Sequence, residues 1–367
     1  MSSEKTVRDL LGRAGIGING KQAWDIQVLN PKFYDRLLAE GSLAVGESYM
    51  DGWWECEKLD ELVRRAMKSK LEQMVHGWRE YLDTARAILF NPQLRYHAFY
   101  NAERHYDIGS DLYDKMLDKR KIYSCGYWQG AKTLDQAQVN KLELIFKKIG
   151  LKRGMRLLDI GCGWGALAEY AARKYGATVV GITVSSDQYR EARERCKDLP
   201  VKIKLQDYRD LTGRFDRIVS VGMFEHVGYK NYRRFMETAR RCLTDDGVFL
   251  LHTIGNNESN TKVDPWIQRY IFPNALLPSI KQIGAAMEGL FVMEDWHNFG
   301  PDYDKTLMAW FQNFDRHWES LKKDYDERFY RMWKFYLLGC AGAFRARVIQ
   351  VWQIVLSKYG VAIPRVR

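Results

Sequence analysis

The sequence predicts an α/β protein with a doubly wound, Rossmann-like sheet and a small N-terminal domain. From residue 155 onward, short apolar runs alternate with stretches of helical periodicity. A glycine-rich turn follows the first apolar run. The chain has 367 residues, 46% of them hydrophobic, which is enough for one large and one smaller domain. Alternation of this kind is typical of parallel sheets, whose ligands bind at the carboxyl ends of the strands.

The N-terminal part is predicted to form a separate small domain over residues 1–90. Proline ends a helix, so Asn91 and Pro92 mark a plausible boundary, and residues 91–367 form the larger catalytic domain. Within the small domain, residues 23–29 are expected to form a strand. Residues 41–42 and 46–54 are expected to be loops, and residues 59–90 have the apolar spacing of a helix.

The larger domain contains five candidate strands. They are residues 156–160, 178–183, 201–205, 215–221 and 248–253. Residues 166–174 and 188–196 are the helices expected between the first three. Further along, residues 329–358 carry apolar side chains at helical spacing, which favours a core or dimer helix over one that lies on a membrane.

The turn after the first strand is the first candidate binding site. Gly161, Gly163 and Gly165 alternate with other residues, so the backbone can turn sharply and approach a ligand closely. The spacing is GxGxG rather than the GxGxxG of a dinucleotide site. Asp159 precedes the turn, and its carboxylate suits a cation. S-adenosylmethionine, which has a sulfonium and an ammonium but no phosphate, meets these conditions; the alternative is an ordinary βα turn.

The ends of the next two strands offer further polar groups. Many folds of this kind place an acidic residue after the second strand to bind ribose hydroxyls. This chain has Thr183 there instead, followed by Gln188. After the third strand, Asp207 or Tyr208 could bracket an adenine ring, or the segment could be a capped turn.

Several reactive side chains form a candidate catalytic cluster. Glu225 follows the fourth strand and His252 lies at the end of the fifth, while Cys125 lies upstream and Tyr303 downstream. Each alone has a structural interpretation, as a capping residue, a core histidine, a buried thiol or a surface tyrosine. Glu225 and His252 are expected on adjacent strand ends beside the glycine turn, which favours a shared active site.

Eight motifs together resemble the bacterial cyclopropane-fatty-acyl-phospholipid synthases. They are YSCGYW, LDIGCGWG, GITVSSDQ, LQDYRDL, VGMFEHVG, LLHTIG, VDPWIQRYIFP and VMEDWHNFGPDYDKTLMAW. The resemblance runs along almost the whole chain. The mycolic acid cyclopropane synthases are similar over the catalytic part only.

The resemblance implies a reaction and its residues. It implies methyl transfer from S-adenosylmethionine to the cis double bond of an unsaturated phospholipid acyl chain, followed by loss of a proton to a bound bicarbonate ion and ring closure. The implied bicarbonate site consists of Cys125, Glu225, His252, the Ile254 backbone and Tyr303. The implied cofactor positions are Tyr123, Ser124, Gly161, Gly163, Thr183, Gln188, Tyr208 and Arg209.

Charge and composition bear on partners and location. The net charge is +11, and the first hundred residues are neutral, so the excess lies in the rest of the chain. A basic surface indicates an anionic partner or a solubility feature. The resemblance favours anionic lipid over nucleic acid, a homodimer, and a cytoplasmic enzyme bound peripherally to the inner face of the cell membrane. Residues 264–278 look like an acyl-site loop. The six scattered cysteines indicate reduced thiols, and no metal is expected.

Two other functions compete with this prediction. The first is a related methyltransferase that acts on an amine, and the second is a lipid- or nucleic-acid-binding protein without activity. The set of Cys125, Glu225, His252 and Tyr303 argues against the first, because an amine acceptor needs no base to deprotonate the transferred methyl. The glycine turn argues against the second.

Overall fold

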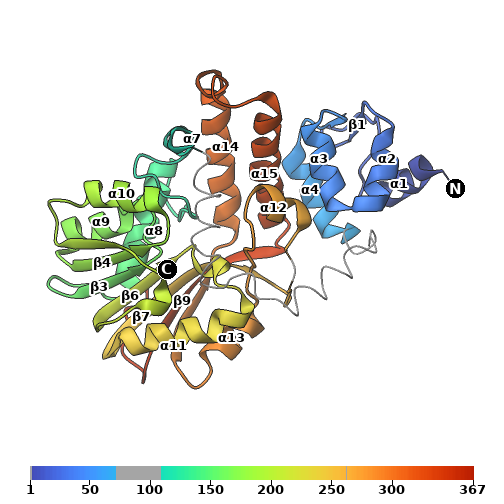
Figure 1. The fold of residues 1–367 in the computed structure, drawn as a ribbon. Helices are drawn as coiled ribbons and strands as arrows, with labels where there is room; N and C mark the ends of the chain where they lie inside the picture. Colours follow the sequence, from blue (N-terminus) through green and yellow to red (C-terminus); the bar gives the residue numbers. More distant parts are fainter. Residues whose placement is uncertain (1, 72–108, 262) are drawn as a thin grey trace. The chain divides into compact units, whose positions relative to one another are not determined.

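The computed structural model describes residues 2–71, 109–261 and 263–367 (Figure 1). The chain divides into two compact units. Unit 1 takes residues 1–90, 261–273 and 303–349, and unit 2 takes residues 91–260, 274–302 and 350–367. Two later segments of the chain therefore group with its N-terminal part. The boundary expected at Asn91 and Pro92 lies outside the described residues.

Unit 2 is built on a mainly parallel sheet, which in the described part of the chain has seven strands in the order β5-β4-β3-β6-β7-β9-β8. Strands β3 to β7 pair in parallel, and β8 is antiparallel to β9. Their bounds are β3 Arg156–Ile160, β4 Thr178–Thr183, β5 Val201–Leu205, β6 Phe215–Val221, β7 Leu243–Asn256, β8 Val292–Asn298 and β9 Ile349–Ser357. This architecture confirms the predicted Rossmann-like class.

The first four predicted strands begin and end at the expected residues. They are short apolar runs bounded by glycine or by polar turns, so their limits are set locally. The fifth, β7, is longer than predicted and begins at Leu243, because Phe215 pairs with Leu243 before a register shift. The predicted helices correspond to α9 Ala166–Tyr175 and α10 Ser186–Arg195.

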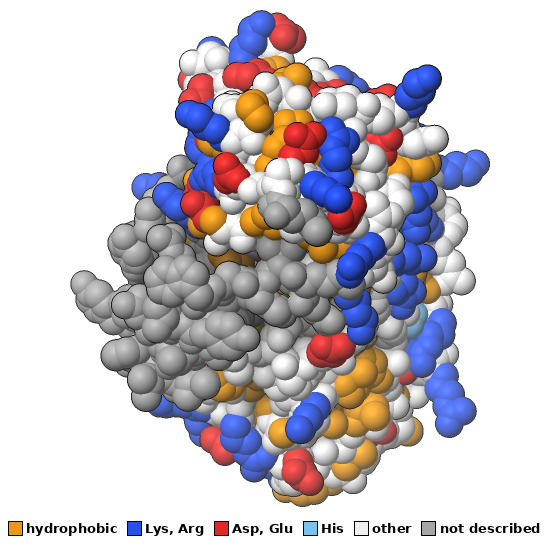
Figure 2. Space-filling view, turned by 90° about the vertical axis from the view of Figure 1, so that its right-hand side faces the viewer, with side chains coloured by type: hydrophobic (Ala, Val, Ile, Leu, Met, Phe, Trp, Pro, Cys, Tyr) orange, Lys and Arg blue, Asp and Glu red, His pale blue; other side chains and the backbone are white. Residues whose placement is uncertain are grey.

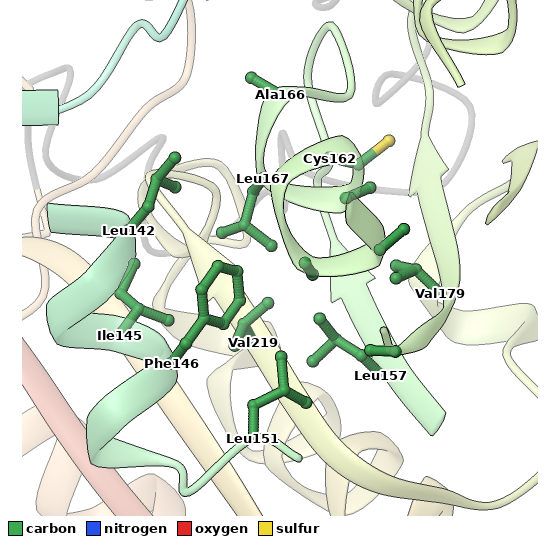
Figure 3. Close-up of a cluster of buried hydrophobic side chains, with 14 of the residues drawn as sticks. Leu142, Ile145, Phe146, Leu151, Leu157, Cys162, Ala166, Leu167, Val179 and Val219 are labelled. Atoms are coloured by element: carbon green, nitrogen blue, oxygen red, sulfur yellow. The ribbon is translucent and has the colours of Figure 1, made fainter. Parts of the chain in front are cut away.

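Helices cover both faces of the sheet (Figure 1). On one face, α8 Leu134–Lys148, α9 and α10 bury a cluster that includes Phe146 and Leu157. Figure 3 shows Leu142, Ile145 and Phe146 of α8 pointing toward the strands and the turn before α9. On the other face, α11 Tyr232–Cys242 and α13 Ile280–Met287 bury a second cluster around Phe235.

The strand order creates a switch point at the centre of the sheet. From β3 the chain proceeds outward through β4 and β5, and then returns to β6 on the opposite side of β3. At such a point the connections after the two central strands diverge and leave a crevice at the carboxyl ends. The residues that follow β3 and β6 lie at this position, as do those of the neighbouring β7.

The described part of unit 1 is helical with one short two-stranded sheet. Its helices are α1 Ser3–Gly12, α2 Lys32–Glu40, α3 Ser42–Met50, α4 Leu59–Lys68, α12 Pro265–Tyr270, α14 Pro301–Leu321 and α15 Glu327–Arg345. The sheet pairs β1 Gln27–Val28 antiparallel with β2 Trp54–Glu55, and helices α2 and α3 lie between the two strands in the chain. Trp54 is fully buried and meets the edge of Phe335 at 6.3 Å between ring centroids. These aromatic contacts join the N-terminal elements to α15.

Three local predictions in unit 1 were wrong. The loop expected at residues 41–42 and 46–54 is largely helix α3, in which Gly46 is a packing position. A Cβ there would lie 2.3 Å from the ring of Trp266, so only glycine lets the two elements meet. The strand expected over residues 23–29 is reduced to β1. The predicted helix from Leu59 ends at Lys68, and residues 72–90 lie outside the described residues.

The helix predicted over residues 329–358 was also wrong in its second part. Helix α15 ends at Arg345, Arg347 adopts a left-handed φ of 63°, and residues 349–357 form strand β9. β9 pairs along its two edges with β7 and β8. Nearly all of its side chains are buried, so both faces are covered and its apolar run has no polar side. β-branched Val351, Ile354 and Val355 favour the strand. The segment 264–278 likewise contains α12 and is not wholly loop.

Candidate cofactor and active site

The glycine turn after β3 opens onto free space. Gly161, Gly163 and Gly165 have φ angles of 86°, 53° and 83°, in the left-handed region that favours glycine. A Cβ on Gly163 would meet no atom of the described residues within 4 Å, whereas one on Gly161 would lie 2.8 Å from Met223. The amides of Gly161 and Cys162 both donate to the Ile182 carbonyl, which ties the turn to β4. Gly163 therefore borders a space that a side chain would enter.

Asp159 lies just before this turn as a buried carboxyl group. Its Oδ2 atom has no hydrogen-bond partner among the described residues. Burial raises the pKa of Asp159 to about 7, against the opposing charge of Lys141. An orphaned buried carboxyl at the carboxyl end of a central strand fits a cationic group such as the ammonium of S-adenosylmethionine.

Thr183 and Gln188 come together at the end of the neighbouring β4. The Thr183 hydroxyl bonds Gln188 Oε1 at 2.8 Å, and the Ser185 amide donates to Thr183 Oγ1 at 3.2 Å. Ser185 caps α10 by accepting from the Gln188 amide. Both side chains are buried, so they present neutral polar groups in a fixed arrangement beside the turn.

The segment after β5 forms a capped turn. Asp207 accepts from the Arg209 amide at 2.8 Å and from its guanidinium at 2.9 Å. Tyr208 is buried in the core beneath α11, with its ring 5.2 Å from that of Phe235. The capped-turn alternative is therefore the observed geometry. An adenine contact of Asp207 or Tyr208 stays a prediction, as does cofactor binding by Tyr208 and Arg209.

The segment that contains Tyr123, Ser124 and Cys125 is held from below by α8. Lys141 Nζ donates to Ser124 Oγ at 2.7 Å, and Gln138 Nε2 donates to the Ser124 carbonyl at 2.8 Å. Cys125 is fully buried, and its thiol donates to the Gly126 carbonyl at 3.2 Å. The Tyr123 ring lies 5.3 Å from that of Tyr113 on α7 Ser110–Met116.

Glu225 and Ile254 are joined directly at the ends of β6 and β7. The Ile254 amide donates to Glu225 Oε1 at 2.7 Å. Glu225 Oε2 is buried without a hydrogen-bond partner in the described part of the chain, and the nearby Thr253 hydroxyl donates to the Ile254 carbonyl. Burial raises the pKa of Glu225 to about 7, although the Ile254 amide acts in the opposite direction. This carboxyl group can exchange a proton near neutral pH.

His252 is a buried imidazole on β7. It pairs across the sheet with Val221, and its Nδ1 lies 3.4 Å from Gln353 Nε2 on β9. Burial, aided by the charge of Lys141, holds its pKa well below the usual range. The ring meets Phe299 edge-on at 5.6 Å. A neutral imidazole offers one donor and one acceptor rather than a charge.

Tyr303 is the one member of the predicted bicarbonate set that belongs to unit 1. Its ring lies 4.6 Å from that of Phe344 and 5.9 Å from that of Trp310, and the side chain is buried. The other four residues, Cys125, Glu225, His252 and Ile254, all belong to unit 2.

Three buried residues of this region escaped the sequence prediction. Lys141 and Gln138 on α8 hold the segment at Ser124, and Gln353 faces His252. A signal existed for Lys141, because it lies four residues from Ala137 and from Ile145 on the apolar face of α8. A lysine at such a position is easily assigned to the solvent side. No comparable pattern marks Gln353.

The described residues contain neither a metal-type cluster nor a membrane-length helix. No group of three or more His, Cys, Asp or Glu side chains there is arranged to hold a metal ion. No helix among them is both long and apolar enough to cross a bilayer. All six cysteines are free thiols.

Comparisons with known proteins assign the family. Residues 93–354 match the model of the mycolic acid cyclopropane synthetase family. The cyclopropane-fatty-acyl-phospholipid synthase of Escherichia coli is 54% identical over 96% of this chain and 93% of its own. The crystal structure of mycolic acid cyclopropane synthase CmaA1 complexed with SAH and CTAB is 34% identical, with a TM-score of 0.67 over 71% of this chain and 98% of that one.

A more distant structure shares the fold alone. Coclaurine N-methyltransferase, bound to N-methylheliamine and SAH, is 20% identical, with a TM-score of 0.67 over 85% of this chain and 97% of its own. The high identity to the bacterial enzyme over nearly the whole chain decides between these groups. The chain belongs to the family of cyclopropane-fatty-acyl-phospholipid synthases, which are S-adenosylmethionine-dependent methyltransferases.

Proposed function

We propose that this enzyme transfers a methylene group from S-adenosylmethionine to the cis double bond of unsaturated acyl chains in membrane phospholipids, with a bound bicarbonate ion as the base. The observation that carries the proposal is the hydrogen bond from the Ile254 amide to buried Glu225, next to His252 on the strand ends beside the glycine turn. The name of the Escherichia coli relative supports the substrate.

The glycine turn and Asp159 are the proposed cofactor cradle. When bound, S-adenosylmethionine supplies an electrophilic methyl group on its sulfonium. Gly163 would leave room for the ligand, Asp159 would hold its ammonium, and Thr183 and Gln188 would offer polar groups to its hydroxyls. An alkene is a weak nucleophile, so orientation by these fixed groups contributes much of the rate.

The cluster at Glu225 is the proposed site of deprotonation. The ion would take the proton that ring closure releases, and the protein's part is to hold it in a dry site. Glu225 Oε2 has no hydrogen-bond partner among the described residues, so it can accept one from the ion. Neutral His252 can donate a hydrogen bond to the ion or accept one from it. The Ile254 amide already donates to Glu225, so its part in the proposal is to fix that carboxyl group. Cys125 and Tyr303 complete the set by resemblance.

Association with the membrane surface completes the proposal. The excess positive charge after residue 100 supports peripheral binding to anionic lipid, with residues 264–278 near the acyl chain. We further propose a homodimer, a cytoplasmic location, and a role for residues 1–90 in substrate, membrane or dimer contacts. The dimer rests on the resemblance alone.

Mass spectrometry of lipids tests the function. In cells that express the wild-type chain, unsaturated phospholipid acyl chains should gain the mass of one methylene group. Gas chromatography should then separate cyclopropane from methyl-branched products. Unmodified unsaturated chains, despite folded protein and available S-adenosylmethionine, would overturn the proposal.

The Glu225→Gln variant tests whether Glu225 belongs to the site that binds the bicarbonate base. The amide keeps the shape but replaces an acceptor-only carboxylate by a group that also donates. We expect near-normal affinity for S-adenosylmethionine by calorimetry and a loss of turnover of about 10²-fold or more, the scale of a positioned base. Added bicarbonate should raise the rate of degassed wild type and have little effect on the variant. Lost cofactor binding with intact turnover at saturation would instead place Glu225 in the cofactor site.

A further inference from the structure

Lys141 is a buried cation whose charge lacks a direct counter-ion. Its side chain is 1% exposed, and its Nζ atom donates to Ser124 Oγ at 2.7 Å. An ammonium has three donors, and this is its one hydrogen bond among the described residues; none of their carboxylates forms an ion pair with it. Burial of such a charge is unfavourable unless an opposite charge on a ligand compensates it.

The bond to Lys141 determines the direction of the Ser124 hydroxyl. Because Ser124 Oγ accepts from the ammonium, its own proton must point to a different acceptor. No such acceptor lies among the described residues. Gln138 meanwhile holds the Ser124 carbonyl, so the residue cannot swing away. The result is a fixed O–H donor backed by a positive charge.

Buried carboxyl groups near Lys141 provide the opposite, negative charge. The strongest electrostatic attraction on Lys141 comes from buried Asp118. The carboxylate of Asp118 accepts from the Ile122 and Arg120 amides. Asp159 attracts Lys141 more weakly and forms no ion pair with it, and its Oδ2 atom has no hydrogen-bond partner among the described residues. The fold therefore keeps two opposite buried charges apart. A zwitterion with one ammonium and one carboxylate compensates both, and the amino-acid part of S-adenosylmethionine is such a group.

We propose that Lys141 is a positioning residue that acts through Ser124, making its hydroxyl an obligatory donor to a carboxylate-type anion. The inference rests on the proposed function. The carboxylate of S-adenosylmethionine is the first source of this chemistry, and free bicarbonate, bound beside neighbouring Cys125, is the second. Burial lowers the pKa of Lys141 to about 8, so the ammonium that donates to Ser124 loses its charge in mildly alkaline solution.

Binding of two cofactor forms tests the proposal without any turnover. Calorimetry would compare S-adenosylmethionine with its decarboxylated analogue in wild type, Lys141→Met and Ser124→Ala. A hydrogen bond to a charged group is worth roughly 10- to 100-fold in affinity. We expect wild type to prefer the carboxylated form by about that factor. Both variants should lose the preference and bind the analogue within about threefold of wild type.

Lys148→Met is the matched control. Lys148 is also buried on α8, but it donates to Asp295 at 2.9 Å and not to Ser124. Its replacement should lower stability and leave the preference between the two cofactor forms unchanged. If Lys141→Met lost affinity equally for S-adenosylmethionine and for its decarboxylated analogue, Lys141 would have a purely structural role and the proposal would be wrong. Ser124→Ala keeps the test valid if Lys141→Met does not fold.

A second experiment distinguishes free bicarbonate from the carboxylate of S-adenosylmethionine as the bound anion. Thermal unfolding would be followed with added sodium bicarbonate against sodium chloride at equal ionic strength. If bicarbonate stabilises wild type but not Lys141→Met, while the cofactor preference persists, the anion is bicarbonate. If neither measurement changes in the variants, the proposal is wrong. If wild type binds neither cofactor form, the proposed function fails first, and the inference with it.

Discussion

At the scale of single residues, burial rather than contact chemistry sets the electrostatics of the site. The carboxyl groups of Asp159 and Glu225 are enclosed, and each has one oxygen without a partner in the described residues. Their pKa values are both raised to about 7. In solvent, the same side chains would be ionised throughout the neutral range. The site thus has two groups that change charge close to neutral pH, which suits ligand binding and proton transfer.

Gly163→Asn should abolish binding of S-adenosylmethionine in a folded protein. Asparagine tolerates the left-handed φ of 53° better than other residues, so the backbone survives while a side chain enters the open space. Gly154→Asn is the control, since Gly154 has a φ of 83°, is exposed and also borders empty space. Calorimetry should show binding in the control and none in Gly163→Asn. Equal affinity in both variants would remove Gly163 from the cofactor site.

The affinity for S-adenosylmethionine should depend on pH through Asp159. The folded-state pKa is raised, so this residue's contribution to stability is present at low pH and is lost as the pH rises through about 7. A bound ammonium group favours the ionised carboxylate of Asp159, so the ligand should bind more tightly as Asp159 loses its proton. Between about pH 6 and pH 8, wild-type affinity should improve roughly tenfold relative to Asp159→Asn. Since both proteins bind the same titrating ligand, a constant ratio would exclude Asp159 as the partner.

At the scale of elements, glycine positions show which helices must approach closely. In α3, a Cβ on Gly46 would overlap the Trp266 ring of α12, whereas in α15 a Cβ on Gly339 would have ordinary contact with Val63 at 3.9 Å. Both glycines lie within helices of unit 1. The same substitution therefore has opposite expected effects at the two positions.

Gly46→Ala should destabilise unit 1 by about 1–3 kcal/mol through overpacking. Gly339→Ala should be neutral or stabilising by up to about 1 kcal/mol, because alanine favours helix without a collision. Urea unfolding, followed by the fluorescence of the tryptophans, measures both. A Gly46→Ala protein as stable as wild type would show that α3 and α12 can separate at little cost.

At the scale of the whole molecule, charge is the feature most relevant to the proposed binding to anionic lipid. The net charge is +11, and Figure 2 shows many exposed Lys and Arg side chains on the face in view. Exposed charges of this kind attract an anionic surface over about one Debye length.

Binding to vesicles should therefore weaken with salt. The Debye length shortens from about 10 Å at 0.1 M to about 3 Å at 1 M salt. Co-sedimentation with anionic phospholipid vesicles should fall over this range, while weaker binding to zwitterionic vesicles should change little. Salt-independent binding to anionic vesicles would leave insertion of apolar side chains as the main attraction.

The sequence by itself determined the sheet, the glycine turn and the family. Strands β3 to β6 and the glycine turn are set by local periodicity and by backbone freedom, which are properties of short segments. The positions of Glu225 and His252 on adjacent strand ends followed from the strand order typical of this fold. The long motifs identified the family because they extend over almost the whole chain.

Only the tertiary structure decided which polar side chains are buried away from water. Lys141 belongs to an amphipathic helix, and its burial depends on the packing of α8 beneath Ser124. The strand β9 replaces a predicted helix because β7 and β8 enclose it on both sides. Position 46 of helix α3 requires glycine because the ring of Trp266, more than two hundred residues away, lies where a Cβ would be. In each case a distant neighbour overrides the local preference, since burial and close packing outweigh the small differences in intrinsic propensity.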